Sequence, residues 1–294
     1  MEQNKEINAL FSLIDDPDEE VFGVVSNRIV DYGKGIIPNL EDLWENTPSE
    51  NIQSRIEMLI HRLHFRDLSE EFDLWNRNSH QDLLSGALLV ARFEYPDLNT
   101  AQIYQDIEKL RRNIWLELNT FLTPLEQINV LSSILYNYYN LKGTDVSYQT
   151  PAEFLINKQT ESKKGNALAN EILYLILCDL LDIPVRAISI PRQYVMGYFK
   201  NDYDFEHPDQ VHYSAEFFID PISGQLFSHK DLDTYFKRIN ISSDPEFFTP
   251  LSNRNIIRQL LVEFSKCFNT EKNDYKQTEL LELAKSLEDT NGLD

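Results

Sequence analysis

The spacing of apolar residues changes at Ile183, and this change limits the folds open to the chain. Before Ile183, apolar residues recur every three or four positions, which is typical of amphipathic helices. Three short segments rich in β-branched and aromatic residues then predict antiparallel strands at 185–190 (VRAISI), 194–199 (YVMGYF) and 214–220 (SAEFFID). Helical spacing returns after Pro250. We therefore predict a mainly helical α+β fold with one small antiparallel sheet.

Helix signals cover the chain on both sides of this sheet. Asp15, Asp16 and Asp18 can cap a helix whose first turn carries Glu19 and Glu20, and Pro38 lies in the first turn of the next helix. This hairpin resembles one unit of a HEAT-like repeat, which cannot bury its apolar face alone. Further helices are predicted at 52–65, 68–75, 82–93, 100–121, 124–139, 255–268 and 275–287. The pattern suggests a helical region at 1–94, a core at 95–245 and a C-terminal helical segment at 246–294.

The charge of the chain argues against two classes of partner. It has 48 acidic and 27 basic residues and a formal net charge of −21, which repels nucleic-acid phosphates and anionic lipid. We therefore expect no nucleic-acid and no membrane partner. The start MEQNKEINAL lacks the features of a signal peptide, so we expect a cytoplasmic protein. Cys178 and Cys267 lie in apolar helical runs, which indicates two reduced core thiols.

The strongest apolar helix begins directly after a glycine, in the string KKGNALANEILYLILCDLL at 163–181. Three predicted strands follow it. The order of a helix with a glycine at its start and then three antiparallel strands is similar to the transglutaminase and papain-like arrangement. In that arrangement a Cys at the helix start is activated by a His on a middle strand, which an Asp orients.

Several strings extend the resemblance. They are KKGNALANEILYLILCDLLDIPVRAISIPRQYVMGYF (163–199), YPDLN (95–99), FLTPLEQINVLSSILY (121–136) and FFIDPISGQLFS (217–228). Together they resemble the bacterial SirB-type transglutaminase-like proteins over about residues 80–250. The resemblance implies a transglutaminase-like core flanked by helices.

The resemblance also implies where a catalytic triad would lie. The Cys position falls on Ala167, the His position on Gln193 and the Asp position on Asp220. Neither Ala167 nor Gln193 can perform the chemistry of the residue it replaces, because a methyl group is no nucleophile and an amide accepts no proton near neutral pH. Loss of one triad member typically lowers the rate by on the order of ten-thousand-fold. We therefore expect these three positions to be inactive.

Other candidate groups have simpler explanations. Cys178 lies roughly 20 Å along the helix from Gly165, beyond the reach of the helix N-terminus, and a core role is expected. His61 and His64 could share a metal, but His80 is the one further ligand in view. His207 and His212 lie in an acidic segment that lacks the Gly and Glu of an EF-hand loop. We predict no metal and no cofactor.

The sequence thus favours a non-catalytic transglutaminase-like protein that acts as a protein-interaction or scaffolding module with an unknown protein partner. Two alternatives stay open. One is an enzyme of the superfamily that performs acyl transfer or amide hydrolysis with non-standard residues. The other is a purely structural helical adaptor that depends on residues 1–90. Asp220 has two interpretations of its own, a turn cap before Pro221 and a remnant of the triad.

Overall fold

The computed structural model describes residues 2–199, 215–270 and 273–288. Its contacts divide the chain into two compact units, Met1–Leu74 and Trp75–Asp294. The three-part division at residues 94 and 245 stays a prediction.

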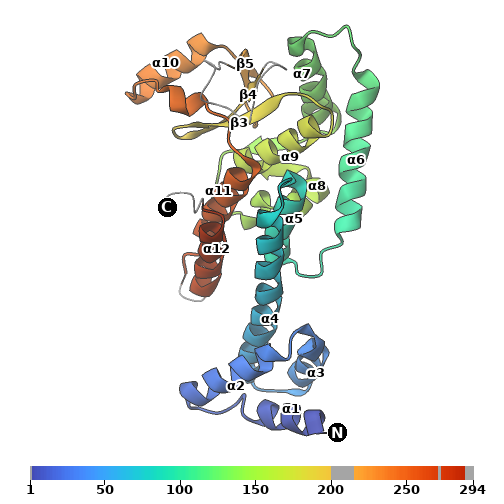
Figure 1. The fold of residues 1–294 in the computed structure, drawn as a ribbon, viewed down its shortest axis with the longest axis vertical. Helices are drawn as coiled ribbons and strands as arrows, with labels where there is room; N and C mark the ends of the chain where they lie inside the picture. The colour runs from blue at the N-terminus through green and yellow to red at the C-terminus, as the bar shows by residue number, and fades with distance from the viewer. Residues whose placement is uncertain (1, 200–214, 271–272, 289–294) are drawn as a thin grey trace. The chain divides into compact units, whose positions relative to one another are not determined.

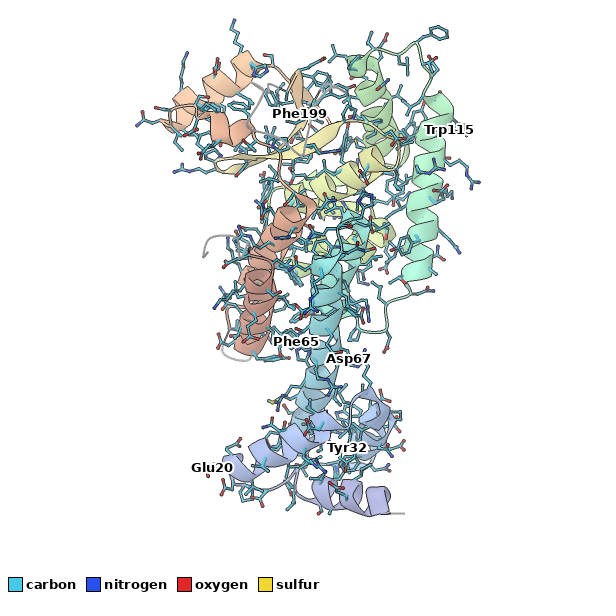
Figure 2. All side chains as sticks on the ribbon, in the orientation of Figure 1. Glu20, Tyr32, Phe65, Asp67, Trp115 and Phe199 are labelled. Carbon is cyan, nitrogen blue, oxygen red and sulfur yellow. The ribbon has the colours of Figure 1, made fainter. Side chains whose placement is uncertain are left out.

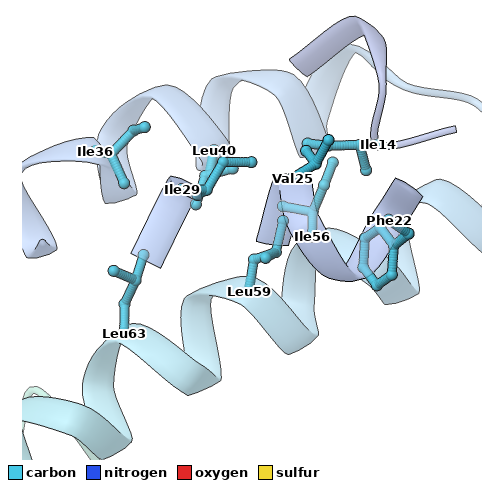
Figure 3. Close-up of a cluster of buried hydrophobic side chains, with 9 residues drawn as sticks. All are labelled: Ile14, Phe22, Val25, Ile29, Ile36, Leu40, Ile56, Leu59 and Leu63. Carbon is cyan, nitrogen blue, oxygen red and sulfur yellow. The ribbon is translucent and has the colours of Figure 1, made fainter. Parts of the chain in front are cut away.

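The first unit consists of helices. They are α1 (Glu2–Ser12), α2 (Glu19–Asp31), the short η1 (Lys34–Ile36), α3 (Ile37–Asn46) and the first part of α4 (Glu50–Arg77). Of the three predicted capping residues, Asp18 caps α2 by accepting a hydrogen bond from the Glu20 amide at 2.9 Å. Buried side chains from these helices form one core, which Figure 3 shows: Ile14, Phe22, Val25, Ile29, Ile36, Leu40, Ile56, Leu59 and Leu63.

The sequence-based prediction of two helices at 52–65 and 68–75 is wrong, because α4 is continuous. The residues between the two segments contain neither Gly nor Pro, so nothing breaks the helix. Instead, Arg66 donates a hydrogen bond to the Val30 carbonyl at 2.6 Å, and Asp67 pairs with Lys34 at 3.3 Å. These polar residues hold α4 against α2 and η1 rather than forming a loop.

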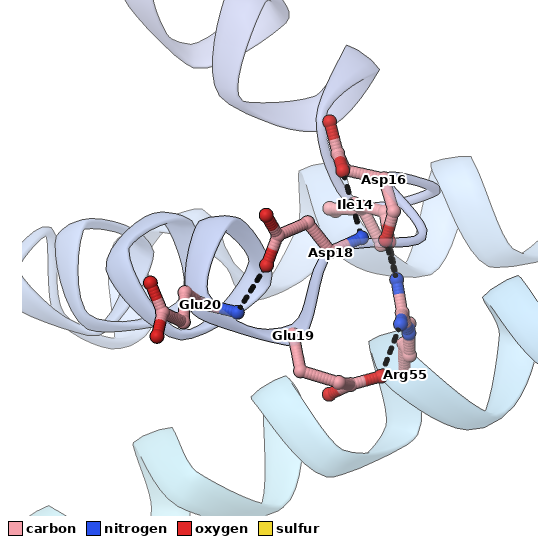
Figure 4. Close-up of polar contacts among 6 residues, drawn as sticks. All are labelled: Ile14, Asp16, Asp18, Glu19, Glu20 and Arg55. Atoms are coloured by element: carbon pink, nitrogen blue, oxygen red, sulfur yellow. Dashed lines mark hydrogen bonds and ion pairs between the residues drawn. The ribbon is translucent and has the colours of Figure 1, made fainter.

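Arg55 joins three parts of the first unit (Figure 4). Its guanidinium donates to the carbonyls of Ile14 at 2.8 Å and Asp16 at 2.7 Å, and it pairs with Glu19 at 2.7 Å. It also lies 4.4 Å from the centre of the Phe22 ring. One planar cation therefore satisfies two carbonyl groups in the turn after α1 and pairs with the acidic residue that begins α2.

We expect Arg55→Lys to lower the free energy of unfolding by about 1–2 kcal/mol, because one ammonium group cannot reproduce this forked set of hydrogen bonds. Urea unfolding measures the change. Arg28→Lys is the matched control, because Arg28 pairs with Glu6 at the surface with more than half of its side chain exposed. The control is expected to change stability little. Equal effects of the two substitutions would contradict the role assigned to Arg55.

The second unit contains the remaining helices. They are α5 (Leu83–Glu94), α6 (Thr100–Glu117), α7 (Pro124–Ser132) with a π-helical extension η2 (Ser133–Tyr138), η3 (Pro151–Phe154), α8 (Ile156–Ser162), α9 (Ala167–Asp179), α10 (His229–Ile239), η5 (Pro245–Phe248), α11 (Asn253–Ser265), η6 (Lys266–Phe268) and α12 (Asp274–Ser286). The predicted helices at 82–93, 124–139, 255–268 and 275–287 are confirmed within a few residues. Two α-helices, α8 and α10, and the short helices η3 and η5 are absent from the sequence-based prediction.

The strands of the second unit form two groups. An antiparallel sheet has the order β3 (Val185–Ile190), β4 (Gln193–Tyr198), β5 (Phe217–Ile219) and β6 (Leu226–Phe227). This confirms the three predicted strands, within the described residues, and adds β6. A separate parallel pair joins β1 (Lys142–Thr144) to β2 (Lys164–Asn166) directly before α9. Thus the glycine that precedes α9 lies in a short strand.

The two faces of the larger sheet carry different helices. Figure 1 shows α9 and α10 on opposite sides of β3 and β4. On the α10 side, a buried cluster joins strand residues to two residues of that helix: Ile188, Ile190, Val195, Phe199, Ala215, Phe218, Leu232 and Phe236. The register pairs Ile188 with Val195 and Gly197 with Phe218, so alternate residues of each strand share this face. The residues that alternate with these along β3 and β4 face α9.

Candidate functional site

The N-terminal end of α9 is the part of the second unit where the superfamily arrangement would place a nucleophile. Asn166 caps the helix by accepting a hydrogen bond from the Ala169 amide at 2.9 Å. Ala167 is the first helical residue and is 5% exposed. The family resemblance predicts that Ala167 occupies the Cys position, and its methyl group offers no reactive atom.

Two glycines allow the segments before α9 to approach it closely. A side chain at Gly165 would come 2.5 Å from Oδ1 of Asn170 and 2.7 Å from Nε2 of Gln159. A side chain at Gly143 would overlap the backbone of Ile222, which follows β5. Gly143 and Gly165 are also paired with each other in the β1–β2 register. The glycine at the helix start therefore has a packing role, and it needs no catalytic one.

A group of buried polar side chains surrounds this helix start. Asn157, Gln159, Asn166, Asn170 and Glu171 are each 2% exposed or less. Nε2 of Gln159 donates to Oδ1 of Asn170 at 2.7 Å, but four other amide atoms in the group have no hydrogen-bond partner among the described residues. Buried polar groups without partners are uncommon and often mark functional positions. The α9 start therefore keeps a polar interior without a nucleophile.

Glu171 is the one carboxyl in this polar group. Burial raises its pKa well above the ordinary value, because the surroundings disfavour the charged form. It lies one helical turn after Ala167, on the same face of α9. The pKa of Tyr194 on β4 is also raised, chiefly by burial, with smaller contributions that include Glu171. A carboxyl with a raised pKa and a tyrosine thus lie between α9 and the sheet.

The structure does not bring Gln193 to Ala167. Gln193 begins β4 and faces α10, where it lines a pocket with Val195, Leu232 and Tyr235. Its neighbour Tyr194 faces α9 instead. Ala167 and Gln193 therefore have side chains on opposite sides of the sheet, and a direct contact between them is not possible in this arrangement.

The Asp220 side chain makes its hydrogen bonds within the turn that follows β5. Its carboxylate accepts hydrogen bonds from the Ile222 amide at 3.1 Å and from the Ser223 hydroxyl at 2.5 Å. The Gly224 amide also donates to the Asp220 carbonyl at 2.8 Å. These contacts confirm the turn-cap interpretation. A remnant of a triad at this position stays a prediction.

Cys178 lies in the core, as predicted. It is fully buried, and burial raises the pKa of its thiol. Cys267 is also a free thiol, but it is half-buried, and burial raises its pKa to about 12. Arg186 opposes this effect at Cys178, but burial outweighs it, so neither thiol has the lowered pKa of a reactive cysteine. The predicted core position is therefore met by Cys178, whereas Cys267 lies nearer the surface than expected.

No metal site is visible in the part of the chain that the structure describes, where no three His, Cys, Asp or Glu side chains gather as a ligand set. His61 and His64 lie on α4 of the first unit, and His61 stacks on Phe65. The acidic segment with His207 and His212 lies outside the described residues. Across residues 2–199, 215–270 and 273–288, no helix combines the length and apolar character that crossing a bilayer requires.

Comparison with known proteins agrees with this architecture. A sequence profile described as "Transglutaminase-like superfamily" matches residues 101–262, which include α6 to α9, the sheet and most of α11. The chain therefore belongs to the transglutaminase-like superfamily. No solved structure matches it significantly.

Curated relatives narrow the family to the SirB type. The chain is 24% identical to UPF0162 protein YchA of Escherichia coli (strain K12) over 183 residues, and 21% identical to protein SirB1 of Salmonella typhimurium over the same number. Each match covers 61% of this chain and 64% of the relative. A UPF0162 protein of Xylella fastidiosa (strain Temecula1) is 29% identical over 133 residues, 42% of this chain and 46% of the relative. The matched region thus spans less than two thirds of each relative's length.

Proposed function

We propose that this chain is a transglutaminase-like protein without covalent catalysis, which acts as a protein-interaction or scaffolding module. One observation carries the proposal: the first turn of α9 presents Ala167 where a nucleophile would lie, and the only cysteine on α9 is buried at its other end. The contacts of Gln193 and Asp220 support it further, because Gln193 faces α10 and the Asp220 carboxylate accepts hydrogen bonds within its own turn. Acyl transfer begins when a base activates a nucleophile that then attacks the substrate carbonyl. Without a nucleophile and a base in contact, this first step cannot occur.

The surface of the second unit supports an interaction role. Large apolar side chains are exposed between the end of α6 and the start of α7, namely Trp115 at 59%, Leu116 at 66%, Phe121 at 93% and Leu125 at 48%. Figure 2 shows Trp115 on the outer side of α6. Neighbouring exposed apolar residues that include Trp are typical of protein-binding surfaces.

Thiol labelling tests the absence of an activated cysteine. We expect iodoacetamide to leave Cys178 unmodified in the native protein and to modify Cys267 slowly, because the first thiol is buried and the second is half-buried with a raised pKa. Peptide mass spectrometry after labelling locates the modified residue. In guanidinium chloride both thiols should react at similar rates. Rapid modification of Cys178 in the folded protein would contradict the proposal.

A second candidate function rests on Glu171. A buried carboxyl with a raised pKa can keep its proton near neutral pH and act as a general acid, and Tyr194 lies near it. This arrangement favours an enzyme of the same superfamily that uses a non-standard residue set for acyl transfer or amide hydrolysis.

An activity assay separates the two candidates. The protein is incubated with a glutamine peptide and a primary amine, and both amide exchange and ammonia release are measured. We expect no turnover above the rate without protein. Turnover that Glu171→Gln or Cys178→Ala abolishes would establish the enzyme and overturn the non-catalytic proposal.

A further inference from the structure

A pocket of about 290 Å³ is lined by residues of β4 and α10, on the face of the sheet that carries the buried cluster of α10. Val195, Phe227, Leu232 and the ring of Tyr235 give it an apolar interior. Its volume is near the lower end of the range of about 300–1,000 Å³ for small-molecule sites. The pocket therefore suits a small ligand with an apolar body.

Three polar side chains at the pocket are already bonded within the protein. The Tyr235 hydroxyl donates to the Pro191 carbonyl at 2.8 Å, which ties α10 to the β3–β4 turn. Asp231 accepts hydrogen bonds from the Ser228 amide at 2.8 Å and hydroxyl at 2.7 Å. Thr234 donates to the Lys230 carbonyl at 2.8 Å. These groups shape the pocket, but their contacts leave less capacity for a ligand.

Two other side chains keep free hydrogen-bond donors at the pocket. The Gln193 amide makes no hydrogen bond to another described residue. The Arg238 guanidinium lies 5.4 Å from the centre of the Tyr235 ring, and no carboxylate of the described residues lies within ion-pair distance of it. The ring helps to orient the cation without neutralising it. An amide and a guanidinium thus remain at one pocket with unused N–H groups.

We propose that this pocket binds a small carboxylate with an apolar body. A carboxylate only accepts hydrogen bonds, and it matches the forked donors of an arginine. The apolar part of the ligand would cover Val195, Phe227 and Leu232. The net charge of −21 and the Asp231 carboxylate at the pocket both repel an anion, so binding has to come from the donors of Arg238 and Gln193. The proposal is independent of whether α9 supports catalysis.

A pair of probes of similar shape tests the proposal on the full chain. 3-Phenylpropionate carries the carboxylate, and 3-phenylpropanamide replaces it with a neutral amide. Ligand-observed NMR titration measures the dissociation constant of each. We expect saturable binding of the carboxylate and binding at least about tenfold weaker for the amide, because a charge-assisted hydrogen bond is lost.

Three variants locate the binding. Arg238→Gln should weaken 3-phenylpropionate binding about tenfold, whereas Lys237→Gln, one position earlier on α10, should leave it nearly unchanged. Thr234→Trp should fill the pocket and abolish binding of both probes, with circular dichroism confirming that α10 is retained. The proposal is overturned if the carboxylate does not bind at millimolar concentration, if the amide binds equally well, or if Arg238→Gln and Lys237→Gln have the same effect.

Discussion

Replacement of Gly143 by Ala is expected to lower the free energy of unfolding by about 3 kcal/mol, at the upper end of the range for overpacking. The added methyl group would overlap the backbone of Ile222, and it would lie 2.9 Å from Nδ2 of Asn170. A backbone cannot move aside as the end of a flexible side chain can. The substitution should therefore separate the turn after β5 from β1 and α9.

Gly23→Ala provides the contrast, because a methyl group at Gly23 in α2 would meet no atom within 4 Å. In a helix interior this change is expected to stabilise by roughly 0.5–1 kcal/mol. Urea unfolding followed by far-UV circular dichroism measures both variants. Opposite signs are expected for the two substitutions, and a Gly143→Ala protein as stable as the wild type would refute the close packing described here.

Replacement of Glu171 by Gln is expected to raise the free energy of unfolding near pH 8 by about 1–3 kcal/mol. Glu171 is 2% exposed, and burial raises its pKa in the folded state. At high pH the Glu171 carboxyl of the unfolded chain has lost its proton. The folded wild type must then either bury the charged carboxylate or keep the proton on Glu171, and both lower its stability relative to the unfolded chain. Gln has nearly the same shape and carries no ionisable group, so the variant avoids this cost.

The pH dependence gives the sign of the effect. Between the unfolded pKa near 4.5 and the raised folded pKa, the folded state binds more protons than the unfolded state. The wild type therefore loses stability as the pH rises through this window, and Glu171→Gln should remove that loss. Denaturation from pH 5 to pH 8 measures the difference. Glu282→Gln, at an exposed position of α12, is the control and should show no such trend. A difference between Glu171→Gln and the wild type that does not grow with pH would contradict this account.

Local patterns in the sequence predicted most of the helices and three of the strands. Helices such as α5 and α9 were predictable because long apolar runs with clear ends leave few alternatives. Strands β3 and β4 were predictable because β-branched and aromatic residues are concentrated there. α10 could have been found from the helical spacing of Leu232, Tyr235, Phe236 and Ile239, although its other residues are polar.

Strands β1 and β2 and the pocket beside α10 depend on contacts between distant segments, which no local sequence pattern shows. β1 and β2 have three residues each, and they exist because segments about twenty positions apart pair beside α9. The pocket also required α10 to pack on the sheet face opposite α9. For the candidate site, the sequence therefore indicated which residue types were present but not which side chains would meet.

The sequence by itself determined that no thiol and no imidazole occupy the positions at Ala167 and Gln193, because residue identity needs no folding. The tertiary structure alone decided that Gln193 faces α10 while Tyr194 faces α9. Adjacent strand residues point to opposite faces, and a shift of one residue in register exchanges them. That register is set by the pairing of β4 with β3 and β5 and by the helices packed on each face, which are contacts between distant parts of the chain.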